Sequence, residues 1–145
     1  MKTVAELLRT KSNTFLYSVD ADDSLLDGLR IMAEKGVGAL VVLSGGRMVG
    51  IVSERDYVRK VALADRSMLD AKVNTIMTRE VISVSPRDNL QYCMQLMTER
   101  RLRHLPVVAE GELIGMLSIG DLVKQTIDDQ ASLIQQLEQY IRGEQ

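Results

Sequence analysis

Side chains that carry out chemistry are scarce in this sequence. Its 145 residues include one histidine, one cysteine, no tryptophan, one phenylalanine and four tyrosines. A single cysteine, Cys93, cannot form a disulfide within the chain, and His104 with Cys93 is too small a set for a zinc site. The sequence also lacks an adjacent nucleophile and base and the glycine-rich loop of nucleotide hydrolases. We therefore expect a protein that is not an enzyme and that holds no metal.

Long apolar runs and a strong excess of one charge are absent as well. No apolar run approaches the roughly 20 residues that span a membrane, and the N-terminus MKTVAELLRTK lacks the pattern of a secretory signal. A net charge of −2 argues against a protein that coats nucleic acid. With 46% hydrophobic and 26% charged residues, the composition indicates a cytoplasmic globular protein with neither membrane nor nucleic-acid partners.

One short pattern occurs twice. Residues 48–60 read MVGIVSERDYVRK and residues 113–125 read LIGMLSIGDLVKQ, and both contain Gly, two apolar residues, Ser, two variable positions and Asp. A shift of 65 positions aligns 17–60 with 82–125 without a gap, and 13 of the 44 aligned pairs are identical. Chance alone gives about three identities. The chain therefore contains two copies of one structural unit, which indicates a pseudo-symmetric pair.

The periodicity within each copy predicts the order β-α-β-β-α. A short apolar run at 15–19 or 81–84 is followed by apolar residues with helical spacing. Two β-rich runs joined by a glycine-containing turn then predict a hairpin, and a second helix is expected after Ser53 or Ser118. The predicted fold class is α/β (α+β), with two tandem units.

The residues outside the repeat predict helical extensions at both ends. Val4, Leu7 and Leu8 indicate an N-terminal helix, and an amphipathic stripe near the C-terminus indicates another. This stripe either packs on its own domain or mediates dimerisation. Its members are Leu133, Ile134, Leu137, Tyr140 and Ile141. The expected divisions are a first unit at 10–65, a linker at 66–79, a second unit at 80–128 and an extension at 129–145.

Two β-α-β-β-α units, each ending in Gly-apolar-apolar-Ser-x-x-Asp, resemble a pair of CBS (cystathionine β-synthase) domains, the regulatory unit called a Bateman module. The second copy adds RLRHLPVV before its hairpin, and SERDYVRK with a short tail resembles stand-alone bacterial CBS pairs. The resemblance covers residues 4–128. It implies two sheets packed against each other, two clefts that commonly bind adenosine-containing ligands, and a homodimer.

The repeated Ser-x-x-Asp has two possible roles. A serine before a helix with an acidic residue three positions later predicts a capping box, which satisfies backbone donors at the helix start. The resemblance instead assigns Asp56 and Asp121 to the ribose of a ligand, with Ser53 and Ser118 near the ribose and phosphate. Both roles are compatible with the pattern.

Further contacts are implied by the resemblance. Arg103 and His104 are phosphate-binding candidates, although His104 could instead be a hydrogen-bonded structural residue. The strand after the linker supplies adenine contacts, largely from its backbone, and Leu16 takes that place in the first copy. The complete set of candidate nucleotide-binding residues is Leu16, Ser53, Arg55, Asp56, Thr78, Val81, Arg101, Arg103, His104, Ser118 and Asp121.

The two clefts are expected to differ. Three positions before the hairpin are basic in the second copy (Arg101, Arg103, His104) and small in the first (Gly36, Gly38, Ala39). Conversely, the first copy has Arg55 where the second has Gly120. We therefore predict that the cleft around Asp121 is the better phosphate site. The cleft around Asp56 is expected to take a different or larger ligand, or none.

Together these features predict a non-catalytic regulatory module that binds an adenosine-containing ligand and signals energy or redox state to an unidentified partner protein. The candidate ligands are AMP, ADP, ATP, NAD or NADH, and S-adenosylmethionine. Two or three phosphates need more cations than Arg103 and His104 supply, which favours AMP or an NAD-type dinucleotide. The alternative is a protein-interaction module with no nucleotide ligand.

Overall fold

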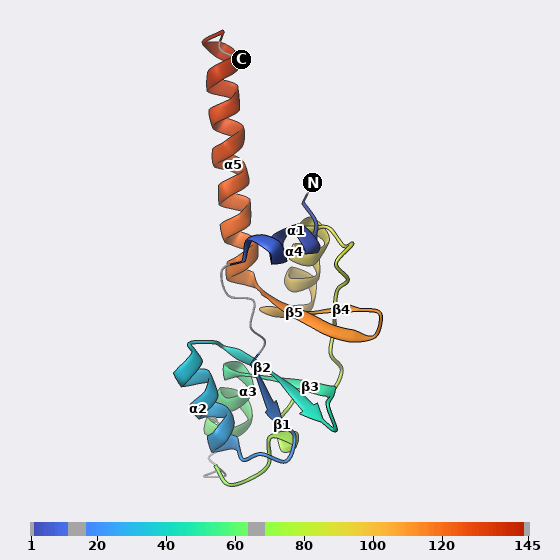
Figure 1. The fold of residues 1–145 in the computed structure, drawn as a ribbon. Coiled ribbons are helices and arrows are strands. Elements are labelled where there is room, and N and C mark those ends of the chain that lie inside the picture. The colour runs from blue at the N-terminus through green and yellow to red at the C-terminus, as the bar shows by residue number, and fades with distance from the viewer. Residues whose placement is uncertain (1, 12–16, 64–68, 144–145) are drawn as a thin grey trace.

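The computed structural model describes residues 2–11, 17–63 and 69–143, and it divides into two units, one above the other in Figure 1. The first unit contains β1 (Ser18–Asp20), α2 (Leu25–Lys35), β2 (Ala39–Ser44), β3 (Arg47–Ser53) and α3 (Glu54–Tyr57), which continues in one π-helical turn (Val58–Ala62). The second unit contains α4 (Leu90–Arg100), β4 (His104–Ala109), β5 (Glu112–Ser118) and α5 (Ile119–Ile141). Two further elements are α1 (Val4–Thr10) and a 3-10 turn (Val73–Thr75). The prediction of a mixed α/β fold with two related units is confirmed.

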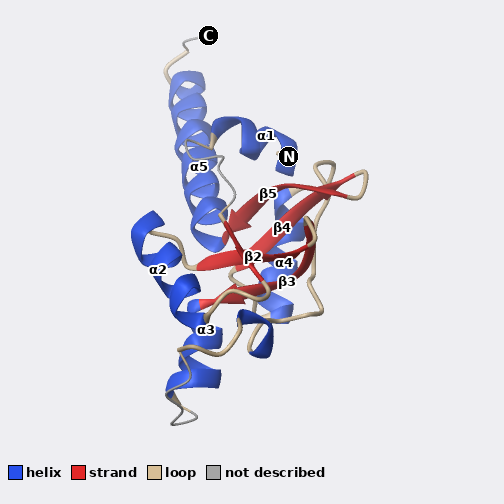
Figure 2. Cartoon of the chain, turned by 60° about the horizontal axis from the view of Figure 1, so that its bottom comes forward, coloured by secondary structure: helices blue, strands red, loops and turns tan. Residues whose placement is uncertain are grey.

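The strands form two small sheets near the middle of the molecule, with helices on the outside (Figure 2). In the first sheet β1 pairs in parallel with β2, and β2 pairs antiparallel with β3. The second sheet contains β4 and β5, paired antiparallel. Both hairpins have one register shift, between Val42 and Leu43 and between Val107 and Val108, so the irregularity is repeated along with the sequence.

The predicted first strand of the second copy is reduced to a single parallel bridge between Val84 and Val107. The two prolines of the chain explain this difference. In the first copy the N–H groups of Ala21 and Val41 donate to the ladder, to the carbonyls of Leu43 and Tyr17. Their counterparts, 65 positions later, are Pro86 and Pro106, which have no N–H to donate. The ladder is therefore confined to the residues around Val84.

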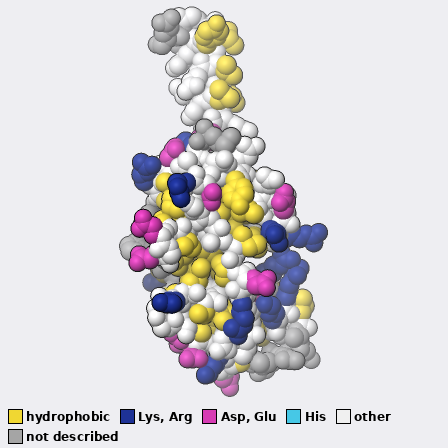
Figure 3. All heavy atoms as spheres, turned by 90° about the vertical axis from the view of Figure 1, so that its right-hand side faces the viewer, with side chains coloured by type: hydrophobic (Ala, Val, Ile, Leu, Met, Phe, Trp, Pro, Cys, Tyr) yellow, Lys and Arg dark blue, Asp and Glu magenta, His cyan; other side chains and the backbone are white. Residues whose placement is uncertain are grey.

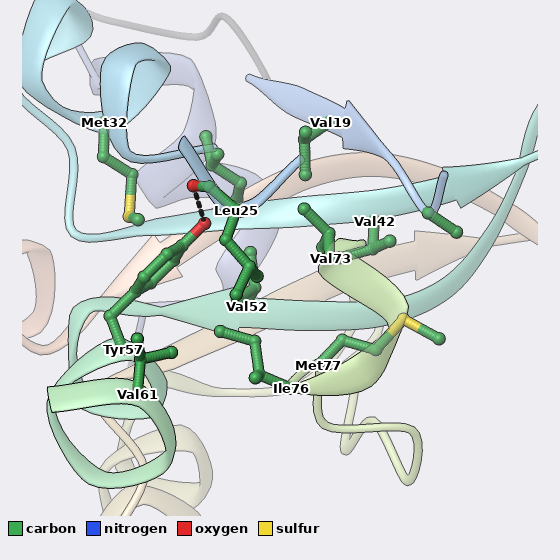
Figure 4. Packing of buried hydrophobic residues seen from close by; sticks show 12 residues of the cluster. Val19, Leu25, Met32, Val42, Val52, Tyr57, Val61, Val73, Ile76 and Met77 are labelled. Carbon is green, nitrogen blue, oxygen red and sulfur yellow. Dashed lines mark hydrogen bonds between the residues drawn. The ribbon is translucent and has the colours of Figure 1, made fainter. Parts of the chain in front are cut away.

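The hydrophobic core has two parts, and each is completed by a segment from beyond its own repeat. Val73, Ile76 and Met77 belong to the cluster of the first unit (Figure 4), although they precede the second repeat. Val4 and Leu7 of α1 belong to the cluster of the second unit. Backbone hydrogen bonds fix these positions, because Leu25 donates to Ala71, Val73 to Asp23, Val4 to Asp88 and Leu90 to Lys2. The segment expected to be a linker (66–79) therefore contributes residues to the core of the first unit in its described part, 69–79.

Both repeats begin and end their first helix in the same way. The side chains of Ser24 and Asn89 accept backbone N–H groups at the starts of α2 and α4. Both helices end at a residue in the left-handed region, which is Gly36 (φ 66°) in α2 and Arg101 (φ 55°) in α4. Glycine adopts this conformation without steric cost and arginine does not.

Of the two alternatives for the C-terminal stripe, packing on its own domain is wrong. The second helix of the second copy and the expected extension form one continuous helix, α5, which projects beyond the body of the molecule (Figure 1). Leu122 and Gln125 near its start are buried, whereas every residue from Thr126 to Ile141 is exposed. Among the residues that the structure describes, no helix has the length and apolar character required to cross a membrane.

Candidate functional site

Each Ser-x-x-Asp forms a complete capping box. The Ser53 hydroxyl accepts the N–H of Asp56 at 3.3 Å, and the Asp56 Oδ2 accepts the N–H of Ser53 at 2.9 Å. The same pair of bonds joins Ser118 and Asp121, at 3.1 and 2.8 Å. The capping role is therefore confirmed in both copies. It orients each carboxylate at the end of a β-hairpin, where the two units meet.

The cleft that contains Asp56 has a volume of about 590 Å³. Residues of the first unit form one wall, including Ser53, Arg55, Asp56 and Thr78. The other wall belongs to the second unit, where α4 ends and β4 begins. It contributes Arg100, Arg101, Leu102, Arg103 and His104.

The structure thus contradicts the placement of the second-copy arginines at the Asp121 cleft. The two units face each other, so the turn before each hairpin lies against the Ser-x-x-Asp of the opposite unit. A Cβ at Gly38 of the first unit would lie 3.6 Å from the Cε1 of His104 in the second, which shows how closely these turns approach. Arg101 and Arg103 therefore line the Asp56 cleft.

The Asp121 cleft is smaller, with a volume of about 260 Å³. Its opposite wall carries the small counterparts of the arginines, Gly36, Gly38 and Ala39. Lys11 lies inside it, 3.0 Å from the Asp121 Oδ2, and donates to the Met116 carbonyl at 2.7 Å. This half-buried cation neutralises the carboxylate and fills space that a ligand would need.

Lys60 stands beside Asp56 in a similar way, with its Nζ 3.1 Å from Oδ1 and 2.7 Å from the Ile76 carbonyl. The Thr78 hydroxyl also donates to Asp56 Oδ1, at 3.4 Å. Thr78 is held there by backbone pairing with Ile51 of β3. Asp56 is 9% exposed, so its carboxylate is nearly buried among donors.

The remaining predicted residues are placed as follows. Val81 is half-buried, and its N–H donates to the Arg79 carbonyl outside the described walls of the two clefts. Leu16 lies outside the described residues. His104, on β4 opposite Ser118, lines both clefts.

Burial lowers the pKa of His104 below its usual 6.5, against the opposing effect of the Asp121 and Glu54 carboxylates. The imidazole is therefore neutral at pH 7 in the ligand-free protein. A phosphate next to it would favour the protonated form. His104 can thus gain a positive charge when an anion binds.

Four cationic residues that line the two clefts were not predicted from the sequence to lie there. Lys60 follows Asp56 by four positions, and this spacing within a helix could have predicted the ion pair. Arg59 and Arg100 had no such signal, because both sit among exposed helical charges. Lys11 comes from the end of α1, and nothing in the sequence indicates that α1 crosses to the second unit. These residues are Lys11, Arg59, Lys60 and Arg100.

Comparison with known families decides what these paired units are. The model of the CBS domain matches residues 4–63 and 73–128. The chain belongs to the CBS-domain family. As a CBS pair it is a regulatory module of a kind that is generally non-catalytic and commonly binds adenosine ligands.

Related CBS proteins match almost the whole chain. The mitochondrial CBS domain-containing protein CBSX3 of Arabidopsis thaliana is 37% identical over 150 residues, covering 97% of this chain and 72% of that protein. A CBS-domain structure from Burkholderia ambifaria MC40-6 is 50% identical with a TM-score of 0.85, covering 89% of this chain and 96% of that one. The CBS-domain containing protein ATU1752 from Agrobacterium tumefaciens is 32% identical with a TM-score of 0.82, covering 86% and 99%.

Proposed function

We propose that this CBS pair binds an adenine nucleotide with two or more phosphates in the Asp56 cleft, and that it signals energy or redox state to a partner protein. ADP, ATP and the dinucleotide NAD are the ligands of this class. The observation that carries the proposal is the arginine cluster of the second unit facing Asp56 of the first. The cytoplasmic location stays a prediction from the sequence.

The charge of the cleft supports a polyphosphate ligand. Its walls contain two carboxylates, Glu54 and Asp56, and six permanent cations. The cations are Arg55, Arg59, Lys60, Arg100, Arg101 and Arg103. Their net charge of +4 exceeds in magnitude the charge of a single phosphate group, and one arginine can donate two hydrogen bonds to phosphate oxygens. The preference for AMP from the sequence rested on two basic residues, Arg103 and His104, whereas the larger number of cations in this cleft supports a ligand with more phosphates.

The geometry supports a nucleoside beside the phosphates. The Asp56 carboxylate can accept both ribose hydroxyls in place of Thr78 and Lys60, which now contact its Oδ1. A volume of about 590 Å³ lies within the range of roughly 300–1,000 Å³ typical of small-molecule sites. The Asp121 cleft, at about 260 Å³, lies below that range.

A ligand in this cleft would contact both units at once. Asp56 and Ser53 come from the first unit, whereas Arg101 and Arg103 come from the second. Binding would therefore favour one relative orientation of the units, and a partner that prefers this orientation would respond to the ligand.

The test is calorimetric titration of the protein with AMP, ADP, ATP, NAD, NADH and S-adenosylmethionine at one fixed salt concentration. We expect Asp56→Ala to abolish binding and the pseudo-symmetric Asp121→Ala to leave it nearly intact. Because both substitutions remove a capping box, each serves as the stability control for the other. We expect Arg103→Gly, the residue of the first copy, to weaken binding about tenfold or more, as for one charge-assisted hydrogen bond.

Two results would contradict this proposal. If Asp121→Ala abolishes binding and Asp56→Ala does not, the smaller cleft is the site. If none of the six ligands binds, the alternative of a protein-interaction module gains support. That alternative is favoured by one structural observation, the exposed apolar stripe of α5.

A further inference from the structure

The projecting part of α5 exposes a row of mostly apolar side chains, and Figure 3 shows hydrophobic side chains on the arm beyond the body. The exposed fraction is 59% for Ile127, 56% for Ile134, 52% for Leu137 and 82% for Ile141. A helical segment of this length without packing contacts is marginal in water, since helices in proteins depend mainly on burial of an apolar face. The row therefore indicates a surface that is covered in solution.

The spacing of this row is that of a coiled coil. Successive members are separated by four, three, four, three and four positions, which is a heptad repeat with an average period of 3.5 residues. They are Val123, Ile127, Gln130, Ile134, Leu137 and Ile141. In heptad notation, isoleucine occupies all three a positions, and the d positions hold valine, glutamine and leucine. The combination of isoleucine at a with leucine at d, which favours two parallel helices, is present at Ile134 and Leu137.

The row points away from the body of the molecule. On the opposite side of α5, Leu122 and Gln125 are buried against the second unit, and Asp129 forms an ion pair with Lys2 at 3.3 Å. These three residues occupy c, f and c positions of the same heptads, and the remaining b, c and f positions beyond Gln125 are polar. A second helix can therefore lie along the row without displacing the body.

From this geometry we propose that α5 forms a parallel two-stranded coiled coil with α5 of a second copy of this chain. The two rows are identical and meet in register, so Gln130 of each copy lies opposite Gln130 of the other and their amides can pair. The flanking e and g positions bring no like charges together across such a dimer. Leu133 faces Glu138 of the partner copy, and Thr126 faces Ala131.

A membrane surface is a poorer match for the same row. Helices that lie in a membrane interface carry lysine and arginine on their polar face. Beyond Gln125, the described part of α5 and its end carry Asp128, Asp129 and Glu138 against Arg142 alone. Anionic lipid would be repelled by this face.

The first test is the mass of the intact protein by sedimentation equilibrium across a range of concentrations. We expect a dimer that Ile134→Asp/Leu137→Asp weakens at least a thousandfold, because four apolar side chains per dimer become charged. The matched control is Gln135→Asp/Gln136→Asp, which places the same charges at adjacent b and c positions and should dimerise like the natural protein. Neither pair belongs to the two hydrophobic cores, so the bodies should stay folded.

The second test is orientation. Leu137→Cys should form an intermolecular disulfide under mild oxidation, because parallel d positions face each other, and Gln135→Cys should not. The natural Cys93 is fully buried and does not compete. Three results would overturn the proposal. The natural protein could be monomeric at every concentration, Ile134→Asp/Leu137→Asp could associate as well as its control, or Leu137→Cys could form no disulfide. If the natural protein is monomeric and binds anionic vesicles, the first of these results would indicate a membrane surface instead.

Discussion

Arg101 is held in a backbone conformation that favours glycine, and we predict that Arg101→Gly raises the stability of the protein. Its φ and ψ of 55° and 46° lie in the left-handed region. At the equivalent end of α2, the chain has Gly36 with φ 66° and ψ 36°. The left-handed conformation costs a residue with a Cβ about 1–2 kcal/mol, because the Cβ crowds the following carbonyl oxygen.

The expected gain in the free energy of unfolding is smaller than the strain energy that the substitution removes. Glycine gives the unfolded chain more conformational freedom, which offsets roughly 0.4–1 kcal/mol. The free energy of unfolding should therefore increase by about 0.5–1 kcal/mol, equivalent to a rise in Tm of about 2–4 °C for a chain of this length. Loss of one positive charge beside Arg100 and Arg103 acts in the same direction at low salt.

The assay is urea unfolding followed by circular dichroism, read as a shift in midpoint at an unchanged slope. The matched control is the reciprocal change, Gly36→Arg, which should lower stability. No described atom lies within 4 Å of a Cβ placed at Gly36, so a loss there would come from the backbone and not from a clash. A lower midpoint for Arg101→Gly, or shifts of the same sign in both variants, would refute the strain argument.

The same variant tests why the strain is present. Arg101 lines the Asp56 cleft, and strained residues often mark ligand sites. Arg101→Gly should therefore weaken the tightest nucleotide about tenfold while it stabilises the ligand-free protein. Unchanged affinity would show that Arg101 makes no contact with the ligand.

Two further predictions concern buried polar groups. The Tyr57 hydroxyl, whose pKa burial raises to about 12, donates to the Leu25 carbonyl at 2.7 Å (Figure 4), so Tyr57→Phe should cost about 1 kcal/mol in urea unfolding. Gly28→Ala should lower the free energy of unfolding further, because its Cβ would collide with the Tyr57 hydroxyl. Adding Tyr57→Phe to Gly28→Ala should restore part of this loss. If the two losses simply add in the double variant, the contact between Gly28 and the Tyr57 hydroxyl is contradicted. The lowered pKa of His104 means that the unfolded chain binds more protons, so stability should fall as the pH drops below 6.5. His104→Gln should reduce this slope in melting curves between pH 5.5 and 7, and an unchanged slope would exclude His104 as its source.

The repeat made much of the fold predictable. Hydrophobic periodicity and turn residues are local signals, so the order of elements and both capping boxes followed from the sequence. The sequence also contains the signal that the first strand of the second copy is shortened. Pro86 and Pro106 replace the residues whose N–H groups extend the ladder in the first copy, Ala21 and Val41.

The clefts were less predictable, because they depend on how the two units meet. The sequence places Arg103 in the same repeat as Asp121, and adjacency within a repeat suggested a shared cleft. Packing of two pseudo-symmetric units instead brings Arg103 opposite Asp56. The same limit applies to Lys11, whose position depends on α1 joining the second unit.

Both units also depend on segments outside their repeats, and α1 connects the units, because it precedes β1 in the chain and packs in the core of the second unit. Without the segment before the second repeat, the first core would lose Val73, Ile76 and Met77, and without α1 the second would lose Val4 and Leu7. Burial of each such side chain contributes about 1.5–3 kcal/mol, whereas a whole domain is stable by about 5–15 kcal/mol. At these values the losses are about 4.5–9 and 3–6 kcal/mol, which is comparable with the stability of a whole domain, so each unit depends on its added segment. The chain joins the units twice, between α1 and β1 and again after Met77, so in the proposed function a ligand between Asp56 and Arg103 would change how two tethered units meet, which a bound partner can detect.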